Sequence, residues 1–288
     1  LSELENLAKL DLAYNDITDL APLSELRQLT SLDLRGNDIT GIAPLSELDL
    51  GEFRVDEEDV VVKFPDKNLE EAVRNKLEIP EGEITEADML EMTTFCANDQ
   101  DIEMVNGLEY AANLTALSLK HNDINNIAPL ADLENLEGLW LKGNKITAFM
   151  PLWGLTNLEV LDLSENAITT VAGLFLLKNL EELYLQENAI TDIEPLEKMK
   201  DLQRLNLMMN NLEDISTLSK LRNLKALTLL HCGITDIGPI SELSKLEHLV
   251  LSENAIKDIG PLAELTNLER LWIAGNKITG ITPLGELT

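Results

Sequence analysis

Four aspartates recur at a fixed interval and are the residues best placed for metal chemistry. They are Asp192, Asp214, Asp236 and Asp258, each 22 residues after the previous one. If each interval adds one strand to a sheet, neighbouring carboxylates lie about 5 Å apart and could share calcium ions. They could instead cap the bend that follows each of them. Because no D-x-[DN]-x-[DN]-G loop accompanies them, we favour the bend and expect no metal or other cofactor.

The other reactive side chains do not form a constellation that could perform catalysis. The three histidines, His121, His231 and His248, are scattered along the chain, and the two cysteines, Cys96 and Cys232, are too far apart for a disulfide. The nucleophile, zinc and phosphate-loop motifs G-x-S-x-G, H-E-x-x-H and G-x-x-x-x-G-K-[ST] are absent. We therefore expect a protein that is not an enzyme.

Asparagine follows the same 22-residue interval. The column comprises Asn15, Asn37, Asn122, Asn144, Asn166, Asn188, Asn210, Asn254 and Asn276, with Cys232 at the position between Asn210 and Asn254. A buried amide can bind backbone groups that a turn leaves unpaired. We therefore predict a structural column in which Cys232 is a small substitute for asparagine and not a nucleophile.

The apolar residues around each asparagine define the elements that must position these side chains. The unit reads L-x-x-L-x-L-x-x-N-x-I-x-x-I-x-P-L-x-x-L-x-x, which is the leucine-rich repeat signature at its short end. Such repeats bury their leucines only against neighbouring repeats. We predict an α/β fold: a right-handed leucine-rich repeat solenoid, shaped as a horseshoe or arc. Its parallel β-sheet is concave, its convex side is irregular or 3₁₀, and a two-helix cap covers one end.

The repeat interval breaks once, because 85 residues separate Asn37 from Asn122. We predict two leucine-rich repeats in 1–48, the tail of an upstream array, an acidic linker in 49–63, a helical cap in 64–91, and one degenerate plus eight regular repeats in 92–288. Because the cap would cover the leading edge of the second array, we expect 1–48 to form a separate unit. A second interpretation is a shortened repeat built on Leu48, Leu50, Phe53 and Val55.

The cap is predicted from local helix signals. Asp66 can cap a helix whose apolar stripe is Leu69, Ala72, Val73 and Leu77. Thr85 and Asp88 form a capping box, and Ile84 and Met89 fit the hydrophobic staple that accompanies it.

These cap residues also carry a family resemblance. The segments Phe64-Pro65-Asp66-Lys67-Asn68-Leu69 and Ile84-Thr85-Glu86-Ala87-Asp88, with the Ile-Thr-Asp-Ile-x-Pro-Leu junction at 190–196, resemble internalin-type bacterial leucine-rich repeat proteins over 64–288. The resemblance implies an extracellular or cell-surface bacterial domain that binds another macromolecule. Two repeats upstream of the cap depart from that pattern. An alternative is an intracellular regulatory scaffold similar to the leucine-rich repeat regulatory subunit of protein phosphatase 1.

The charge of the chain limits its partners. Fifty-two acids and 22 bases give a formal net charge of −30, which opposes binding to nucleic acid or to anionic membranes. No apolar stretch of 18 residues is present, so we expect no membrane insertion.

Strand alternation places three residues of each repeat on the concave face. In the eight regular repeats, those positions hold only two acids, Asp162 and Glu182, against the bases Lys120, Lys142, Arg204 and Arg270. Aromatic residues, methionine and arginine with few acids are typical of protein interfaces. We predict a binding surface for a protein or extended peptide made of Trp140, Tyr184, Arg204, Met208, Leu230, Val250, Arg270 and Trp272.

Overall fold

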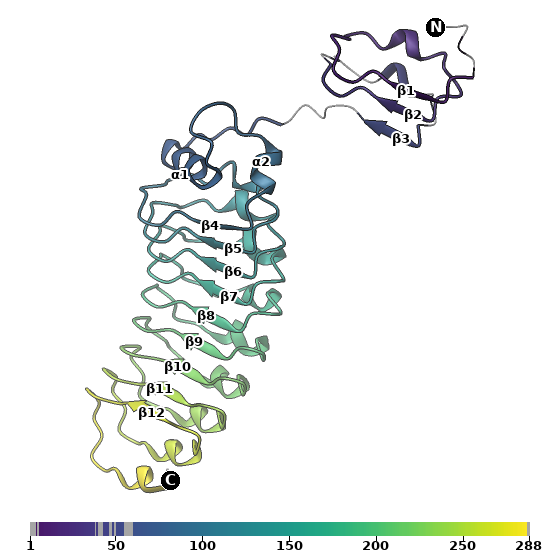
Figure 1. The fold of residues 1–288 in the computed structure, drawn as a ribbon. Coiled ribbons are helices and arrows are strands. Elements are labelled where there is room, and N and C mark those ends of the chain that lie inside the picture. Colours follow the sequence, from purple (N-terminus) through teal and green to yellow (C-terminus); the bar gives the residue numbers. More distant parts are fainter. Residues whose placement is uncertain are drawn as a thin grey trace. The chain divides into compact units, whose positions relative to one another are not determined.

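The computed structural model describes residues 4, 6–37, 39, 43–45, 48, 50–54 and 60–286. It divides the chain into two compact units, 1–60 and 61–288, each with its own parallel sheet and its own apolar core (Figure 1).

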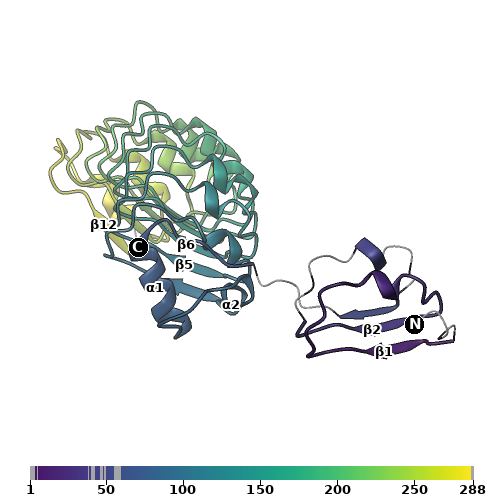
Figure 2. The ribbon, with the colours of Figure 1, turned by 90° about the horizontal axis from the view of Figure 1, so that it is seen from above.

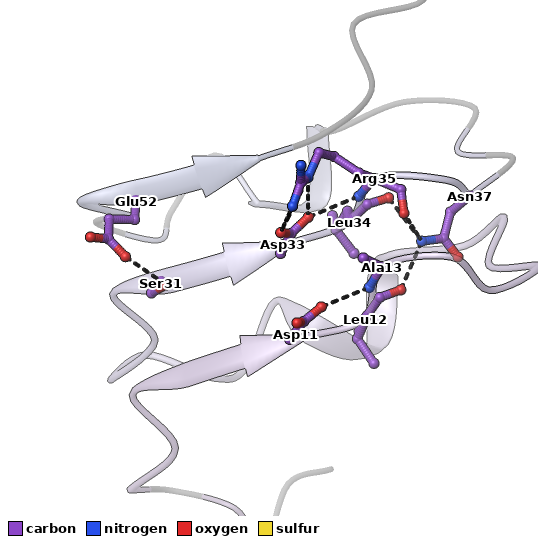
Figure 3. A network of polar contacts seen from close by, with 9 residues as sticks. All are labelled: Asp11, Leu12, Ala13, Ser31, Asp33, Leu34, Arg35, Asn37 and Glu52. Atoms are coloured by element: carbon purple, nitrogen blue, oxygen red, sulfur yellow. Dashed lines mark hydrogen bonds and ion pairs between the residues drawn. The ribbon is translucent and has the colours of Figure 1, made fainter.

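The first unit contains three parallel strands, β1 (Lys9–Asp11), β2 (Ser31–Asp33) and β3 (Glu52–Arg54). Short 3₁₀ helices, Ala21–Leu23 and Ala43–Leu45, follow the first two strands. The Asn37 amide donates to Leu12 O, one repeat earlier, at 2.9 Å (Figure 3). Beside it, the side-chain hydrogen bond from Arg35 lowers the pKa of Asp33 to about 2.

Strand β3 lies inside the acidic linker that we predicted over 49–63, and that boundary is wrong. Phe53 pairs with Leu32 of β2, and Glu52 N donates to Thr30 O at 3.0 Å. Leu48, Leu50 and Phe53 pack against the core of the first unit, as the shortened-repeat interpretation required. The reason is burial: these apolar side chains cover the open leucine layer of the second repeat. Val55 lies outside the described residues.

The second unit begins with two helices and continues as a stack of strands. Helices α1 (Lys67–Leu77) and α2 (Glu86–Leu90) lie at the β4 end of the stack in Figure 1, and Figure 2 shows that end from above. The sheet is parallel, and each strand pairs with the next in the sequence. Its strands are β4 (Thr94–Cys96), β5 (Ala116–Ser118), β6 (Gly138–Trp140), β7 (Val160–Asp162), β8 (Glu182–Tyr184), β9 (Arg204–Asn206), β10 (Ala226–Thr228), β11 (His248–Val250) and β12 (Arg270–Trp272).

Short 3₁₀ helices form the side of the array opposite the sheet. They are Leu108–Tyr110, Ala128–Leu130, Met150–Gly154, Leu174–Leu176, Glu194–Lys198, Ser216–Lys220, Gly238–Glu242, Gly260–Glu264 and Thr282–Glu286. Most begin with proline in the first turn, where its fixed φ fits and its missing N–H is not needed. The predicted solenoid with a parallel sheet, 3₁₀ convex side and N-terminal helices is confirmed.

The asparagine column joins each repeat to the one before it. Asn166 Nδ2 donates to Leu141 O at 3.0 Å and to Leu163 O at 3.1 Å, while its Oδ1 accepts from Ile146 N at 2.9 Å. One side chain thus satisfies backbone groups of two repeats, which would otherwise be buried without partners.

Cys232 performs only part of this role. Its Sγ contacts Leu207 O at 3.1 Å, the carbonyl equivalent to the one that asparagine binds elsewhere. A thiol offers no counterpart of the amide oxygen, so Leu212 N donates to the backbone carbonyl of Cys232 instead, at 3.1 Å. Burial raises the pKa of the Cys232 thiol to about 11, which keeps it protonated and unreactive.

Asp66 fastens the helical cap to the array. Its Oδ1 accepts from Asn68 N (2.9 Å) and Leu69 N (3.0 Å) in α1, as the N-cap prediction required. Its Oδ2 accepts from Glu103 N (2.7 Å) and Met104 N (3.0 Å) in the first repeat. Burial alone would raise the pKa of Asp66, but these four N–H donors outweigh burial and lower it.

The second helix begins with the predicted capping box. Asp88 N donates to Thr85 Oγ1 at 3.2 Å, and Thr85 N donates to Asp88 Oδ2 at 2.8 Å. Ile84 and Met89 are both buried in the core of the unit. A single antiparallel bridge between Val61 and Thr85 leads the chain into the cap.

Candidate protein-binding face

The strand register arranges the outward-facing residues of the second unit in three rows that cross the sheet. The leucine at the centre of each regular strand from β5 to β11 is buried, so the residues on either side of it face outward. The first row is Ala116, Gly138, Val160, Glu182, Arg204, Ala226, His248 and Arg270. The middle row is Ser118, Trp140, Asp162, Tyr184, Asn206, Thr228, Val250 and Trp272. The last row, two residues further along each repeat, is Lys120, Lys142, Ser164, Gln186, Met208, Leu230, Ser252 and Ala274.

All eight predicted contact residues therefore lie on this one face, but most of them are only partly accessible. Trp140, Tyr184, Met208, Leu230 and Val250 are half-buried, whereas Trp272 is 48% exposed. The first five side chains are therefore only partly accessible to a partner. Strands only about 4.8 Å apart place the side chains of each row in contact, so that they shield one another.

Trp140 lies flat along its own strand. A Cβ at Gly138 would collide with the indole ring, so the absence of a side chain there makes room for the tryptophan. Lys120 Nζ lies 5.9 Å from the ring centroid, within the range of a cation–π contact. One face of this aromatic residue is thus already occupied by the protein itself.

Tyr184 belongs to a hydrogen-bonded chain across two strands. Its hydroxyl donates to Glu182 Oε2 at 2.6 Å, and Arg204 Nε lies 3.1 Å from Glu182 Oε1. Burial, together with the hydrogen bond to Glu182, raises the pKa of Tyr184 to about 12. The phenol is therefore neutral at physiological pH, and its proton is committed to Glu182.

Two further charged groups in the repeats of β6 and β7, Lys142 and Asp162, are also bound within the protein. The buried Asp162 carboxylate accepts from the Ser164 hydroxyl at 2.5 Å and from Ser164 N at 3.1 Å. Lys142 Nζ lies 2.8 Å from Glu165 Oε1, and this hydrogen bond raises the pKa of Lys142.

The aspartate column shows the geometry of turns. Each aspartate Oδ1 accepts from the backbone N–H two residues later, and the distance is 2.8 Å for Asp192, Asp214, Asp236 and Asp258 alike. These contacts support the turn interpretation over a calcium ladder. Within the described ranges, no group of three or more His, Cys, Asp or Glu side chains is arranged to hold a metal ion.

Sequence reasoning missed an apolar patch on the convex side. Met150 is 61% exposed and Trp153 is 37% exposed, and the Trp153 indole covers Gly173. Phe175 occupies the same position as Trp153 in the following repeat, and Lys198 Nζ lies 4.5 Å from the centroid of its ring. The sequence did contain a signal for this patch. Trp153 and Phe175 occupy a repeat position that holds Ala131, Glu197 and Ser219 in other repeats.

A second asparagine column was also missed. Each member donates its amide to a carbonyl 23 residues earlier: Asn113, Asn135, Asn157, Asn223 and Asn267. The recurring Asn-Leu pair before each strand was the available signal. No helix among the residues described is long and apolar enough to cross a membrane.

Comparisons with known proteins agree with this architecture. The family model described as "Leucine Rich repeats (2 copies)" matches residues 5–51, 134–176, 156–198, 178–220 and 244–286, and "Leucine Rich repeat" matches 110–127. No curated protein matches the sequence.

Solved structures extend the match to the capped array. An internalin (InlF) of Listeria monocytogenes is 29% identical, with a TM-score of 0.71, covering 78% of this chain and 74% of that one. Internalin C2 of the same bacterium is 32% identical, with a TM-score of 0.62, covering 78% and 91%. A leucine-rich repeat protein of Leptospira interrogans is 25% identical, with a TM-score of 0.67, covering 99% and 71%. The chain therefore belongs to the leucine-rich repeat family, and it is similar in structure to the internalins of Listeria.

Proposed function

We propose that this chain is a non-enzymatic binding module that recognises a protein, or an extended segment of one, through the outward-facing rows of β5–β12. The observation that supports the proposal most is the charge of that face. The chain carries −30 overall, yet the face combines Trp140, Tyr184 and Trp272 with arginines and only two acids. Aromatic residues and arginine supply most of the binding energy at protein interfaces.

The open shape of the surface supports a macromolecular partner. With strands about 4.8 Å apart, the distance from Trp140 on β6 to Trp272 on β12 is roughly 29 Å. A surface of that length suits a protein or an extended peptide, whereas small-molecule sites are enclosed. Leucine-rich repeat domains are typically binding modules rather than catalysts, which agrees with this proposal.

The similarity to internalins supports a role outside the cell. We propose a secreted or surface-displayed bacterial interaction or adhesion module. The acidic character of the rest of the molecule favours solubility and opposes contact with anionic membranes.

The proposal can be tested with random 12-residue peptides displayed on phage and selected on the whole chain. Replacing Trp140, Tyr184 and Trp272 together by alanine should lower the affinity of the selected peptides for the chain at least 30-fold, since each true anchor contributes roughly 2 kcal/mol of binding energy. The matched control is Trp153→Ala, which removes a partly exposed tryptophan from the convex side and should leave affinity unchanged. Circular dichroism checks that each variant is folded. Unchanged affinity in the triple variant would rule out this face.

A further inference from the structure

We infer that the partner binds mainly on strands β9–β12, and that the bound segment carries carboxylates beside apolar side chains. This inference rests on the proposed function and narrows it to one half of the face and one chemical class of partner.

The acidic residues of the face are unevenly distributed between its two halves. The outward-facing positions of β9–β12 are Arg204, Asn206, Met208, Ala226, Thr228, Leu230, His248, Val250, Ser252, Arg270, Trp272 and Ala274. None is acidic, although 52 of the 288 residues in the chain are Asp or Glu. The two acids of the face, Asp162 and Glu182, both lie on β7 and β8. The absence of acids on β9–β12 leaves a surface that attracts carboxylates within an otherwise repelling molecule.

The two arginines of this surface, Arg204 and Arg270, have hydrogen-bond donors that bind no acceptor among the described residues. Arg270 is exposed and makes no ion pair with any described residue. Arg204 uses Nε to bind Glu182, and its terminal nitrogens have no hydrogen-bond acceptor in the described part of the chain. On β5–β8, by contrast, Lys142 is already bound to Glu165. A partner carboxylate would have to compete with that pair, whereas the Arg270 guanidinium pairs with no acid in the described ranges and can bind the carboxylate directly.

The rows on β9–β12 place basic and apolar side chains next to one another. His248 and Arg270 are register partners on adjacent strands, and Ala226 separates His248 from Arg204, so that the first row runs for about 14 Å from Arg204 to Arg270. Apolar residues run alongside it: Val250 and Trp272 in the middle row, and Met208 and Leu230 in the last row. An extended segment rises about 3.3 Å per residue, so roughly five residues could cross these strands. Its carboxylates would face the first row and its apolar side chains the other two.

The peptides selected in the experiment above also test this inference. We expect them to be enriched in Asp and Glu next to Leu or aromatic residues. Arg270→Gln should lower the affinity of these peptides at least tenfold, and their affinity for the unaltered protein should fall as the sodium chloride concentration is raised. Lys142→Gln, the matched control in the repeat of β6, should change affinity less than twofold. Arg270 is exposed, so its replacement is not expected to unfold the array, and circular dichroism verifies this.

The possible failures separate the two proposals. Peptides that lose binding in the triple alanine variant but are basic, or are unaffected by Arg270→Gln, would overturn the acidic-segment inference and leave the proposed face intact. Peptides that tolerate the triple variant, or a selection that enriches none, would overturn both.

Discussion

At the scale of single residues, stability depends on side chains that complete backbone hydrogen bonding between repeats. Asn210 shows the full pattern, because its Nδ2 donates to Leu185 O at 2.9 Å and to Leu207 O at 3.0 Å, and its Oδ1 accepts from Ile190 N at 3.0 Å. Cys232, one repeat later, lacks the oxygen. The column is therefore weakest at Cys232.

Cys232→Asn should stabilise the protein. The new amide oxygen can accept from Leu212 N, and the new amide nitrogen can donate to Leu207 O, so we expect the free energy of unfolding to rise by about 1 kcal/mol. Urea denaturation measures the change, and Asn210→Cys is the matched control, with an effect of opposite sign. A less stable Cys232→Asn protein would show that the column at this point has adapted to sulfur.

A second residue-scale prediction concerns the backbone just before each asparagine. Gly143 has φ +69°, and a Cβ there would also collide with the His121 ring. Gly143→Ala should lower the free energy of unfolding by roughly 1–2 kcal/mol, because a left-handed conformation is costly for residues with a Cβ. Gly280→Ala, where the added carbon meets no atom within 4 Å, is the control and should be close to neutral. Equal effects at the two glycines would contradict this account.

At the scale of elements, one carboxylate makes hydrogen bonds to both the helical cap and the array. Asp66 accepts two N–H donors from α1 and two from the first repeat, which is why its pKa lies below the ordinary value. A carboxyl whose pKa is lower in the folded state stabilises that state above its unfolded pKa of about 3.9. That contribution is lost as the pH falls through the folded pKa.

Asp66→Asn should therefore destabilise the protein at pH 7 by about 2 kcal/mol. The difference from the unaltered protein should shrink as the pH falls below about 4, because Asp66 itself becomes protonated. Thermal unfolding measured at pH 7 and pH 3 gives both values. Glu71→Gln, an exposed position of α1, is the control and should show little effect at either pH. A difference that does not depend on pH would argue against the carboxylate as the anchor.

At the scale of the whole molecule, the dominant electrostatic term is repulsion among 52 acids opposed by only 22 bases. Salt screens such repulsion over a distance of about 10 Å at 0.1 M. The melting temperature should therefore rise with added salt, and by similar amounts for sodium and potassium chloride. Because the column aspartates bind turn N–H groups, micromolar calcium should produce no further saturable rise. A large calcium-specific rise would instead establish a metal site.

The features that depend on a repeated local pattern could be predicted from the amino-acid sequence alone. The 22-residue period predicted the stacked strands, the asparagine column and the bend at each aspartate, because every repeat places the same residue types in the same local geometry. The helix signals at Asp66 and Thr85 act within three residues, so they too could be identified without a structure.

The groups that the face presents to a partner became known only from the packing of the folded chain. Side-chain orientation and contacts between neighbouring strands shield Trp140 over Gly138 and form the Tyr184–Glu182–Arg204 chain. They also leave the Arg270 guanidinium without an ion pair among the described residues. The shortened repeat at β3 likewise became clear only from its pairing with β2. A periodic pattern specifies which residues share a face, but the packing of unlike side chains in adjacent repeats decides which of their atoms remain free to bind.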